Sequence, residues 1–316
     1  MDWLDKLSID FFRFNEEDEV ENLTIVLNDK EFYFNIFIKN KGCISSEKIK
    51  AVYYRGGQFF PARFFIDKLL KSQKKYLKGE WEVINAFFLN YFETLPYLGS
   101  FHQETSNNKI TNLLLARKFG LKIPSTIVTS NLKEILKTDN NFLISKALKK
   151  EVYYEDTDYS YFGEGTIKFA KEEMRKYTNK FFPSQFQNAI VKQFELRVFF
   201  INKKTYTMAI IPLSNKVTQD QNVDYRIYGD KNLTNFYRNI PFSLPFYIEK
   251  KLSNLMQHLN LKIASIDFII NRKGEYIFLE INPVGQYHWV SFFCNYNLDK
   301  EIAIELKNII DGQDYQ

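Results

Sequence analysis

Residues 265–283 read SIDFIINRKGEYIFLEINP, and this is the most informative segment of the sequence. Two apolar runs flank the turn at 271–274, a pattern that predicts a β-hairpin. Alternate side chains of a strand share a face, so Glu280 and Asn282 project together, and the hairpin brings Asp267 beside them. Burying these oxygens is costly unless a hard cation neutralises them, and Mg²⁺ prefers oxygen ligands. The three residues are therefore predicted to form a magnesium site, with carboxylates at a solvated strand edge as the alternative.

Arg197 lies in a second apolar strand, ELRVFFI at 195–201. Arginine is scarce in this chain, with nine among 43 basic residues, so an arginine inside an apolar strand needs an anion. The functional interpretation is a guanidinium presented to phosphate or carboxylate oxygens, and the alternative is an ion pair with Glu195 or Glu280. Two lysines have similar surroundings. Lys146 ends an apolar strand and Lys109 lies in the first turn of a helix, and the alternative for each is an ordinary solvated lysine.

The composition indicates a folded protein of about two domains, or one domain with an added N-terminal module. Its 316 residues are 45% hydrophobic and 17% aromatic, and the net charge of +5 argues against a dedicated nucleic-acid binder. Cys43 and Cys294 are far apart and lack metal-site spacing, which favours a reduced, cytoplasmic protein. No apolar stretch of 18 residues occurs, so a membrane span is not expected.

The fold class expected from the pattern of elements is α+β (α/β), with mostly antiparallel hairpins in the second half. We divide the chain into an N-terminal α/β domain (1–97), a central part (98–185) and a C-terminal part with the metal site (186–316). Strands are expected at 23–27, 32–38, 51–55, 123–129, 142–146, 166–169, 189–193, 196–201, 206–211, 263–271 and 275–281. Helices are expected at 62–77, 80–94, 107–119, 131–138, 245–259 and 298–310, with a polar loop at 149–162.

Several motifs, taken in order, carry a family resemblance. SNNK (106–109), GLKIPST (120–126), FQNAIVK (186–192) and ELRV (195–198), followed by Asp267 and EINP (280–283), resemble the ATP-grasp superfamily over almost the whole chain. LEINPVGQ (279–286), DYR (224–226) and YYRG (53–56) resemble the peptide ligases that make graspetides, the microviridin type, and are most similar to the "grasp-with-spasm" maturases. The resemblance implies an ATP-grasp fold preceded by a pre-ATP-grasp α/β module.

The resemblance also implies a role for each matching residue. ATP would lie between two β-rich subdomains, with Lys109 and Lys146 on its phosphates and Arg197 facing the γ-phosphoryl group. Asp267, Glu280 and Asn282 would hold Mg²⁺. The hinge would be formed by Gln187, Asn188, Ala189 and Ile190, whose backbone would pair with adenine. Glu195 would lie at the edge of the nucleotide, with Lys192 nearby.

Arg226 is the candidate for binding the substrate carboxylate, with Asp224 orienting it or the nucleophile, and the alternative is a loop ion pair of Arg226 with Asp224 or Asp230. The GxG at 163–165 is compatible with an ordinary turn or with a mobile lid.

The function implied is that of an ATP-dependent peptide macrocyclase. It would phosphorylate Asp or Glu side chains of a ribosomally made precursor peptide and join them to Thr, Ser or Lys of the same peptide. Two alternatives are a ligase that adds amino acids to a peptide or protein, as in glutamate-tail ligases, and a non-catalytic nucleotide-binding module. The expected cofactors are ATP and Mg²⁺, and the expected partners are the precursor peptide and a second copy in a homodimer.

Overall fold

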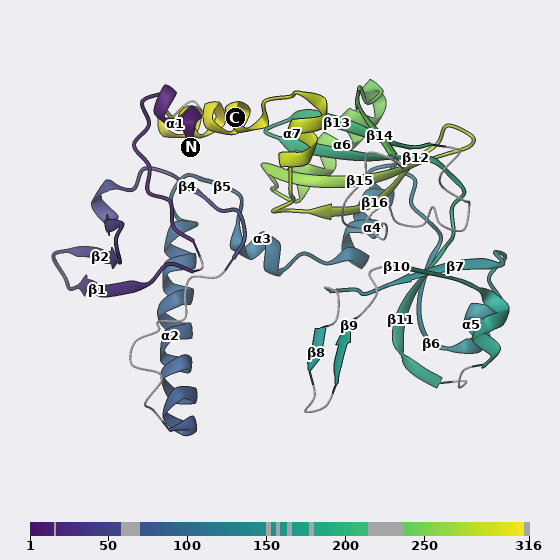
Figure 1. The fold of residues 1–316 in the computed structure, drawn as a ribbon, viewed down its shortest axis with the longest axis horizontal. Helices are drawn as coiled ribbons and strands as arrows, with labels where there is room; N and C mark the ends of the chain where they lie inside the picture. The colour runs from purple at the N-terminus through teal and green to yellow at the C-terminus, as the bar shows by residue number, and fades with distance from the viewer. Residues whose placement is uncertain are drawn as a thin grey trace. The chain divides into compact units, whose positions relative to one another are not determined.

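The computed structural model describes residues 1–15, 17–57, 70–149, 153–155, 159–162, 166–176, 180–213 and 237–312, with the backbone alone at 153–155 and 160–162. The chain packs as two compact units, which Figure 1 shows. Unit 1 comprises Met1–Thr105 and Asn297–Gln316, and unit 2 comprises Ser106–Tyr296. The three-part division made from the sequence stays a prediction.

Unit 1 is built on a three-stranded antiparallel sheet and one long helix. The strands β1 (Val20–Leu27), β2 (Phe32–Ile38) and β3 (Gly42–Ser45) pair in that order. The helix α2 (Lys71–Phe92) packs its aromatic face on the sheet, with the Phe34 and Phe88 rings 5.0 Å apart. The apolar face of this helix is therefore part of the core of unit 1.

The helix α2 also corrects a boundary. The sequence predicted two helices, near 62–77 and 80–94, and residues 62–69 of the first lie outside the described residues. Gly79, between the two, disfavours a helix interior by about 1 kcal/mol. The described structure has one continuous helix from Lys71 to Phe92, since packing of its apolar face outweighs that local cost.

Shorter elements complete unit 1. The strands β4 (Val52–Tyr53) and β5 (Tyr97–Leu98) pair in parallel, and α3 spans Phe101–Thr105. The terminal helices α1 (Asp2–Lys6) and α8 (Leu298–Ile310) lie together, with the ammonium group of Lys300 5.3 Å from the Trp3 ring centroid. The helix at 298–310 was predicted with the right bounds, and it belongs to unit 1.

The first sheet of unit 2 has four antiparallel strands in the order β10-β7-β11-β6. These are β6 (Thr126–Asn131), β7 (Phe142–Lys146), β10 (Thr166–Ala170) and β11 (Lys180–Asn188). One face carries Leu143 and Phe186 and packs against Ile135 of α5 (Leu132–Leu136), with the short helix η3 (Lys171–Lys176) beside α5. The hairpin of β8 (Tyr153–Glu155) and β9 (Ser160–Phe162) falls where only a loop was expected.

The second sheet of unit 2 has five antiparallel strands in the order β14-β13-β12-β15-β16. Their bounds are β12 Lys192–Ile201, β13 Lys204–Pro212, β14 Tyr237–Phe242, β15 Ile263–Asn271 and β16 Tyr276–Asn282. Leu196, Val198 and Phe268 face the helices α4 (Lys109–Lys118) and α6 (Phe246–His258), which cover one side of the sheet. The helix α7 (His288–Cys294) lies next to β13 and β14.

The connection between the two sheets differs from the expected strand at 189–193. β11 ends at Asn188 and β12 begins at Lys192, so residues 189–191 link one sheet to the other. The sequence missed β11, because its polar residues Ser184, Gln185 and Gln187 break the apolar pattern of a core strand.

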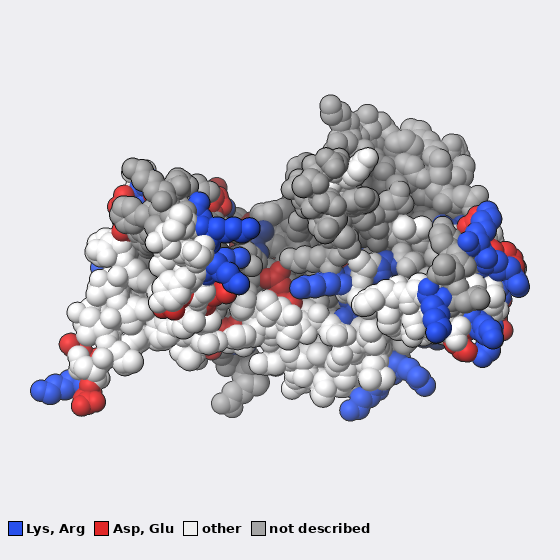
Figure 2. Space-filling model, turned by 90° about the horizontal axis from the view of Figure 1, so that it is seen from below, with Lys and Arg blue, Asp and Glu red and all other residues white. Residues whose placement is uncertain are grey.

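None of the described helices is both long and apolar enough to cross a bilayer. On the face shown in Figure 2, lysine and arginine side chains lie scattered over the described surface with aspartate and glutamate among them.

Candidate active site

A row of charged residues crosses three neighbouring strands of the second sheet. Arg197 on β12 pairs in register with Asp267 on β15, and Asp267 pairs with Glu280 on β16. Nη1 of Arg197 lies 2.7 Å from Oδ1 of Asp267. The structure therefore pairs Arg197 with Asp267, a residue that the ion-pair alternative drawn from the sequence, Glu195 or Glu280, did not include.

A β-bulge puts Glu280 on this face. The register shifts between Asp267 and Phe268, so Asp267 pairs with Glu280 and Phe268 pairs with Phe278, which leaves Leu279 as the extra residue. Without the bulge, the period of two would place Phe278 and Glu280 on one face. With it, Phe278 is fully buried in the core while Glu280 joins the charged row. Asn282, opposite Ser265, shares the face of Glu280.

Two lysine side chains converge on the carboxylate of Glu280. Nζ of Lys146, at the end of β7, lies 2.9 Å from Oε2 of Glu280, and Nζ of Lys109, at the start of α4, lies 3.8 Å from the same oxygen. Lys109 also donates to the carbonyl of Ala147 at 3.0 Å. The two lysines predicted to bind phosphate thus converge on a predicted metal ligand from separate elements.

The pKa values of Glu280 and its neighbour Asp267 shift in opposite directions in this environment. Burial alone would raise the pKa of Glu280, but Lys146, helped by Lys109 and Arg197, outweighs burial and lowers that pKa to about 2. Burial raises the pKa of Asp267 to about 7, because the charge of Arg197 only partly offsets burial and the nearby Glu280 raises it further. Two carboxylates side by side do not both ionise easily without a further cation.

The donor set fits a magnesium ion. Two carboxylates and a carboxamide oxygen are hard oxygen ligands, and the raised pKa of Asp267 marks a carboxylate short of compensating charge. In the described ranges, no group of three or more His, Cys, Asp or Glu side chains is arranged to hold a metal, so a site here depends on Asn282 as well as on the carboxylates.

Two asparagines to which the sequence analysis gave no role, Asn107 and Asn112, hold the start of α4 in place. Nδ2 of Asn107 donates to the carbonyl of Ile281 at 3.0 Å, and Nδ2 of the buried Asn112 donates to Oδ1 of Asn107 at 2.7 Å. Asn108 caps the helix by accepting from the backbone N–H of the second and third residues after it. Lys109 is thereby fixed beside the strand that carries Glu280. A buried asparagine on the apolar side of a helix was the available signal.

The NPVGQ segment is held against β15 through a close backbone approach. A Cβ on Gly285 would lie 2.2 Å from Cβ of Ser265 and 2.9 Å from its backbone nitrogen, distances that real side chains do not adopt. Oγ of Ser265 donates to the carbonyl of Gln286 at 3.2 Å. Glycine at position 285 is therefore required by the packing of this segment on the strand that carries Asp267.

The start of α7 adds an aromatic contact. The guanidinium of Arg197 lies 5.6 Å from the ring centroid of Trp289, within the range of a cation–π interaction. The ring of Tyr287 packs on Phe199, two residues after Arg197, at a centroid distance of 5.1 Å. The residues that follow NPVGQ thus contact the charged face of β12.

The predicted hinge is tied to the first sheet. Nε2 of Gln187 donates to Oγ1 of Thr126 at 3.1 Å, and the backbone N–H groups of Asn188 and Ala189 donate to the carbonyls of Ser125 and Phe142. These two N–H groups bond within the protein, and Ile190 lies in the link between the sheets.

Lys192 and Glu195, at the start of β12, form a short, largely buried ion pair with each other. The last two predicted site residues, Asp224 and Arg226, lie outside the described residues, as do Asp230 and the GxG at 163–165.

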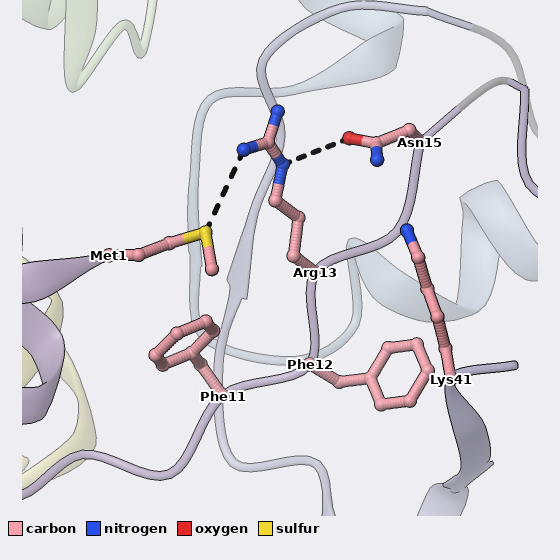
Figure 3. Close-up of a pocket in the computed structure, with 6 residues that line it drawn as sticks. All are labelled: Met1, Phe11, Phe12, Arg13, Asn15 and Lys41. Carbon is pink, nitrogen blue, oxygen red and sulfur yellow. Dashed lines mark hydrogen bonds between the residues drawn. The ribbon is translucent and has the colours of Figure 1, made fainter.

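A depression in the surface of unit 1 differs from the candidate active site in the residues that line it. It has a volume of about 460 Å³ and is lined by Met1, Phe11, Phe12, Arg13, Asn15 and Lys41 (Figure 3). The guanidinium of Arg13 donates to Oδ1 of Asn15 at 2.9 Å and contacts the sulfur of Met1. None of its lining residues is a carboxylate or belongs to the predicted site.

Among known proteins, this chain resembles several solved structures. No protein-family model matches the sequence, and neither does any curated protein. The macrocyclase MdnC from Microcystis aeruginosa MRC, solved with its precursor peptide MdnA, is 22% identical, with a TM-score of 0.77 over 97% of this chain and 94% of that chain.

Two further structures agree. A RiPP-associated ATP-grasp ligase from Chryseobacterium gregarium, in complex with ADP and a leader and core peptide, is 23% identical, with a TM-score of 0.77 over 99% of this chain and 91% of that one. The ATP-grasp ligase PsnB, complexed with a minimal precursor, Mg and ADP, is 15% identical, with a TM-score of 0.66 over 98% and 92% of the two chains. The chain therefore has the ATP-grasp fold of these ligases, as the sequence predicted.

Proposed function

We propose that this protein is an ATP-dependent peptide ligase of the macrocyclase type. The observation that carries the proposal is the charged row of Arg197, Asp267 and Glu280, with Lys146 and Lys109 converging on Glu280. The cations of such a set can position and neutralise a triphosphate and its carboxylates can hold Mg²⁺, which is most of what phosphoryl transfer requires of a protein. The fold shared with ligases solved with ADP and precursor peptides supports the same conclusion.

The reaction has two steps. A side-chain carboxylate of the peptide attacks the γ-phosphorus of ATP, the bond to the leaving ADP breaks, and an acyl phosphate forms. A hydroxyl of Thr or Ser, or an amine of Lys, then attacks the acyl carbon, and inorganic phosphate leaves with formation of an ester or amide. Activation is needed because a free carboxylate is a poor electrophile.

The residues divide the work by their charge. Lys109 and Lys146 would bind phosphate oxygens, and Arg197 would stabilise charge on the transferred phosphoryl group. Asp267, Glu280 and Asn282 would hold Mg²⁺, which when bound neutralises phosphate charge.

The backbone of residues 187–190, with Lys192 and Glu195, would border the nucleotide base and ribose. Arg226 would bind the substrate carboxylate, with Asp224 orienting it.

The partner is a ribosomally made precursor peptide with a leader and a core that contains carboxylate and hydroxyl or amine side chains. Ligases of similar fold have been solved with precursor peptides, or with a leader and core peptide. We further propose that the protein works in the cytoplasm as a homodimer.

The test is co-expression with a candidate precursor, followed by mass spectrometry of the peptide. Loss of one water per bond supports macrocyclisation, whereas a gain in amino-acid units, or no ATP-dependent change with any candidate peptide, would contradict it. Arg197→Ala and Glu280→Gln should abolish ring formation and leave peptide binding largely intact.

Matched controls are Arg175→Ala and Glu134→Gln, because these exposed residues form ion pairs with neighbours three residues away, Glu172 and Lys137. Both should retain full turnover, and near-normal turnover by Arg197→Ala or Glu280→Gln would overturn the site assignment.

A further inference from the structure

Gln185, on β11, is a buried amide with unsatisfied hydrogen-bonding capacity. Only 2% of the residue is exposed, and neither Nε2 nor Oε1 has a hydrogen-bond partner among the residues that the structure describes. Most buried polar side-chain atoms are bonded, and an unmade bond costs free energy in the folded state. By contrast, Gln187 on the same strand donates to Thr126. The exception calls for a functional explanation.

The strand period places this amide on the nucleotide side of the first sheet. Phe186 faces the core with Leu143, so Gln185 and Gln187 face the other way. Phe186 pairs with Ser145, and one residue further along the antiparallel pair come Gln185 and Lys146. The hydroxyl of Ser145 donates to the carbonyl of Gln185 at 3.0 Å, which fixes this register locally.

The same face of the first sheet borders the charged cluster, because the ammonium group of Lys146 lies 2.9 Å from Oε2 of Glu280. Gln185 therefore lies on the same face of the sheet as the lysine proposed to bind phosphate, and two residues before the proposed hinge at 187–190. This inference rests on the proposed function, since it names a contact within the same nucleotide site.

The chemistry of the amide selects the part of the nucleotide that would satisfy it. A carboxamide offers donors on Nε2 and an acceptor on Oε1, and both are unsatisfied here. Phosphate oxygens supply acceptors only. The edge of adenine that carries N6 and N7 presents an amino donor beside a ring-nitrogen acceptor, which a glutamine can bond through both of its groups, whereas the same edge of guanine presents two acceptors, O6 and N7.

We propose that Gln185 reads the base of the bound nucleotide, with its buried amide bonded to the donor–acceptor edge of adenine. The amide is desolvated in the free protein and gains both partners on binding. It thus adds affinity for ATP and discriminates against GTP.

The test variant is Gln185→Met, which keeps the shape of the side chain and removes its polar atoms. Without nucleotide, the midpoint of thermal unfolding should rise by about 2–4 °C, because an unsatisfied buried group is removed. With Mg²⁺ present, calorimetric titration should show ATP binding weakened roughly 3- to 10-fold, GTP binding changed less than about twofold, and binding of inorganic tripolyphosphate unchanged.

Asn85→Leu is the matched control. Oδ1 of Asn85 in α2 is also buried without a partner among the described residues, but it lies in unit 1. This variant should raise the unfolding midpoint and leave ATP binding unchanged.

The outcomes separate the two proposals. If the wild type binds ATP and Gln185→Met binds it equally well, or loses ATP and GTP affinity to the same extent, the inference about Gln185 is wrong while the proposed function stands. A lower unfolding midpoint for Gln185→Met would also overturn it, because the amide would then be satisfied in the free protein. Absence of ATP binding by the wild type would overturn both proposals.

Discussion

Removal of the charge on Glu280 should destabilise the free protein in a pH-dependent way. Its neighbours lower the pKa of this carboxyl from 4.5 to about 2, and at about 1.4 kcal/mol per pKa unit this corresponds to about 3 kcal/mol in favour of the folded state. Since the pKa is lower in the folded protein, the stabilisation is fully present above pH 4.5 and is lost as the pH falls toward 2.

The perturbation is Glu280→Gln, measured by urea denaturation without Mg²⁺ or nucleotide. Replacing Trp3 and Trp81 by Phe leaves Trp289, in the same unit as Glu280, as the sole tryptophan reporter. We expect the free energy of unfolding to fall by about 3 kcal/mol at pH 7, and the difference from the parent to shrink at pH 3.5.

Glu134→Gln is the control, because Glu134 and Lys137 form an exposed pair, which is typically worth less than about 1 kcal/mol. Equal stability of Glu280→Gln and its parent at pH 7, or a difference that does not change with pH, would refute the reasoning about the charge cluster.

Three further changes test other parts of unit 2 and the two thiols. Asp267→Asn should gain stability relative to the wild type as the pH rises from about 4 to 7, because the folded protein holds a proton on Asp267 that the unfolded chain releases; no such trend in denaturation midpoints would contradict the raised pKa. Gly285→Ala should cost about 1–3 kcal/mol by denaturation, with partial recovery in the double variant that also carries Ser265→Gly; full stability of the single variant would contradict the close approach. In the native protein a thiol reagent should label the exposed Cys43 only, because burial raises the pKa of Cys294 to about 11; labelling of both thiols before denaturation would show that Cys294 is accessible.

The sequence was sufficient to predict the fold and the hairpin at its centre. The alternation around the turn at 271–274 defined β15 and β16, and the scarce arginine in β12 marked the charged face of the sheet. These features are local, because a strand period and a turn depend on residues a few positions apart. The ATP-grasp fold predicted from the motifs is the fold observed.

The partners within the site were decided by tertiary structure alone. Lys109 and Lys146 lie 171 and 134 positions before Glu280 in the chain, and no sequence period relates residues so far apart. The bulge at Leu279 reverses which face Glu280 occupies, and the register of β12 and β15 gives Arg197 to Asp267. The opposite pKa shifts of two adjacent carboxyls follow from these distances and from burial, which exist only once the two sheets have packed.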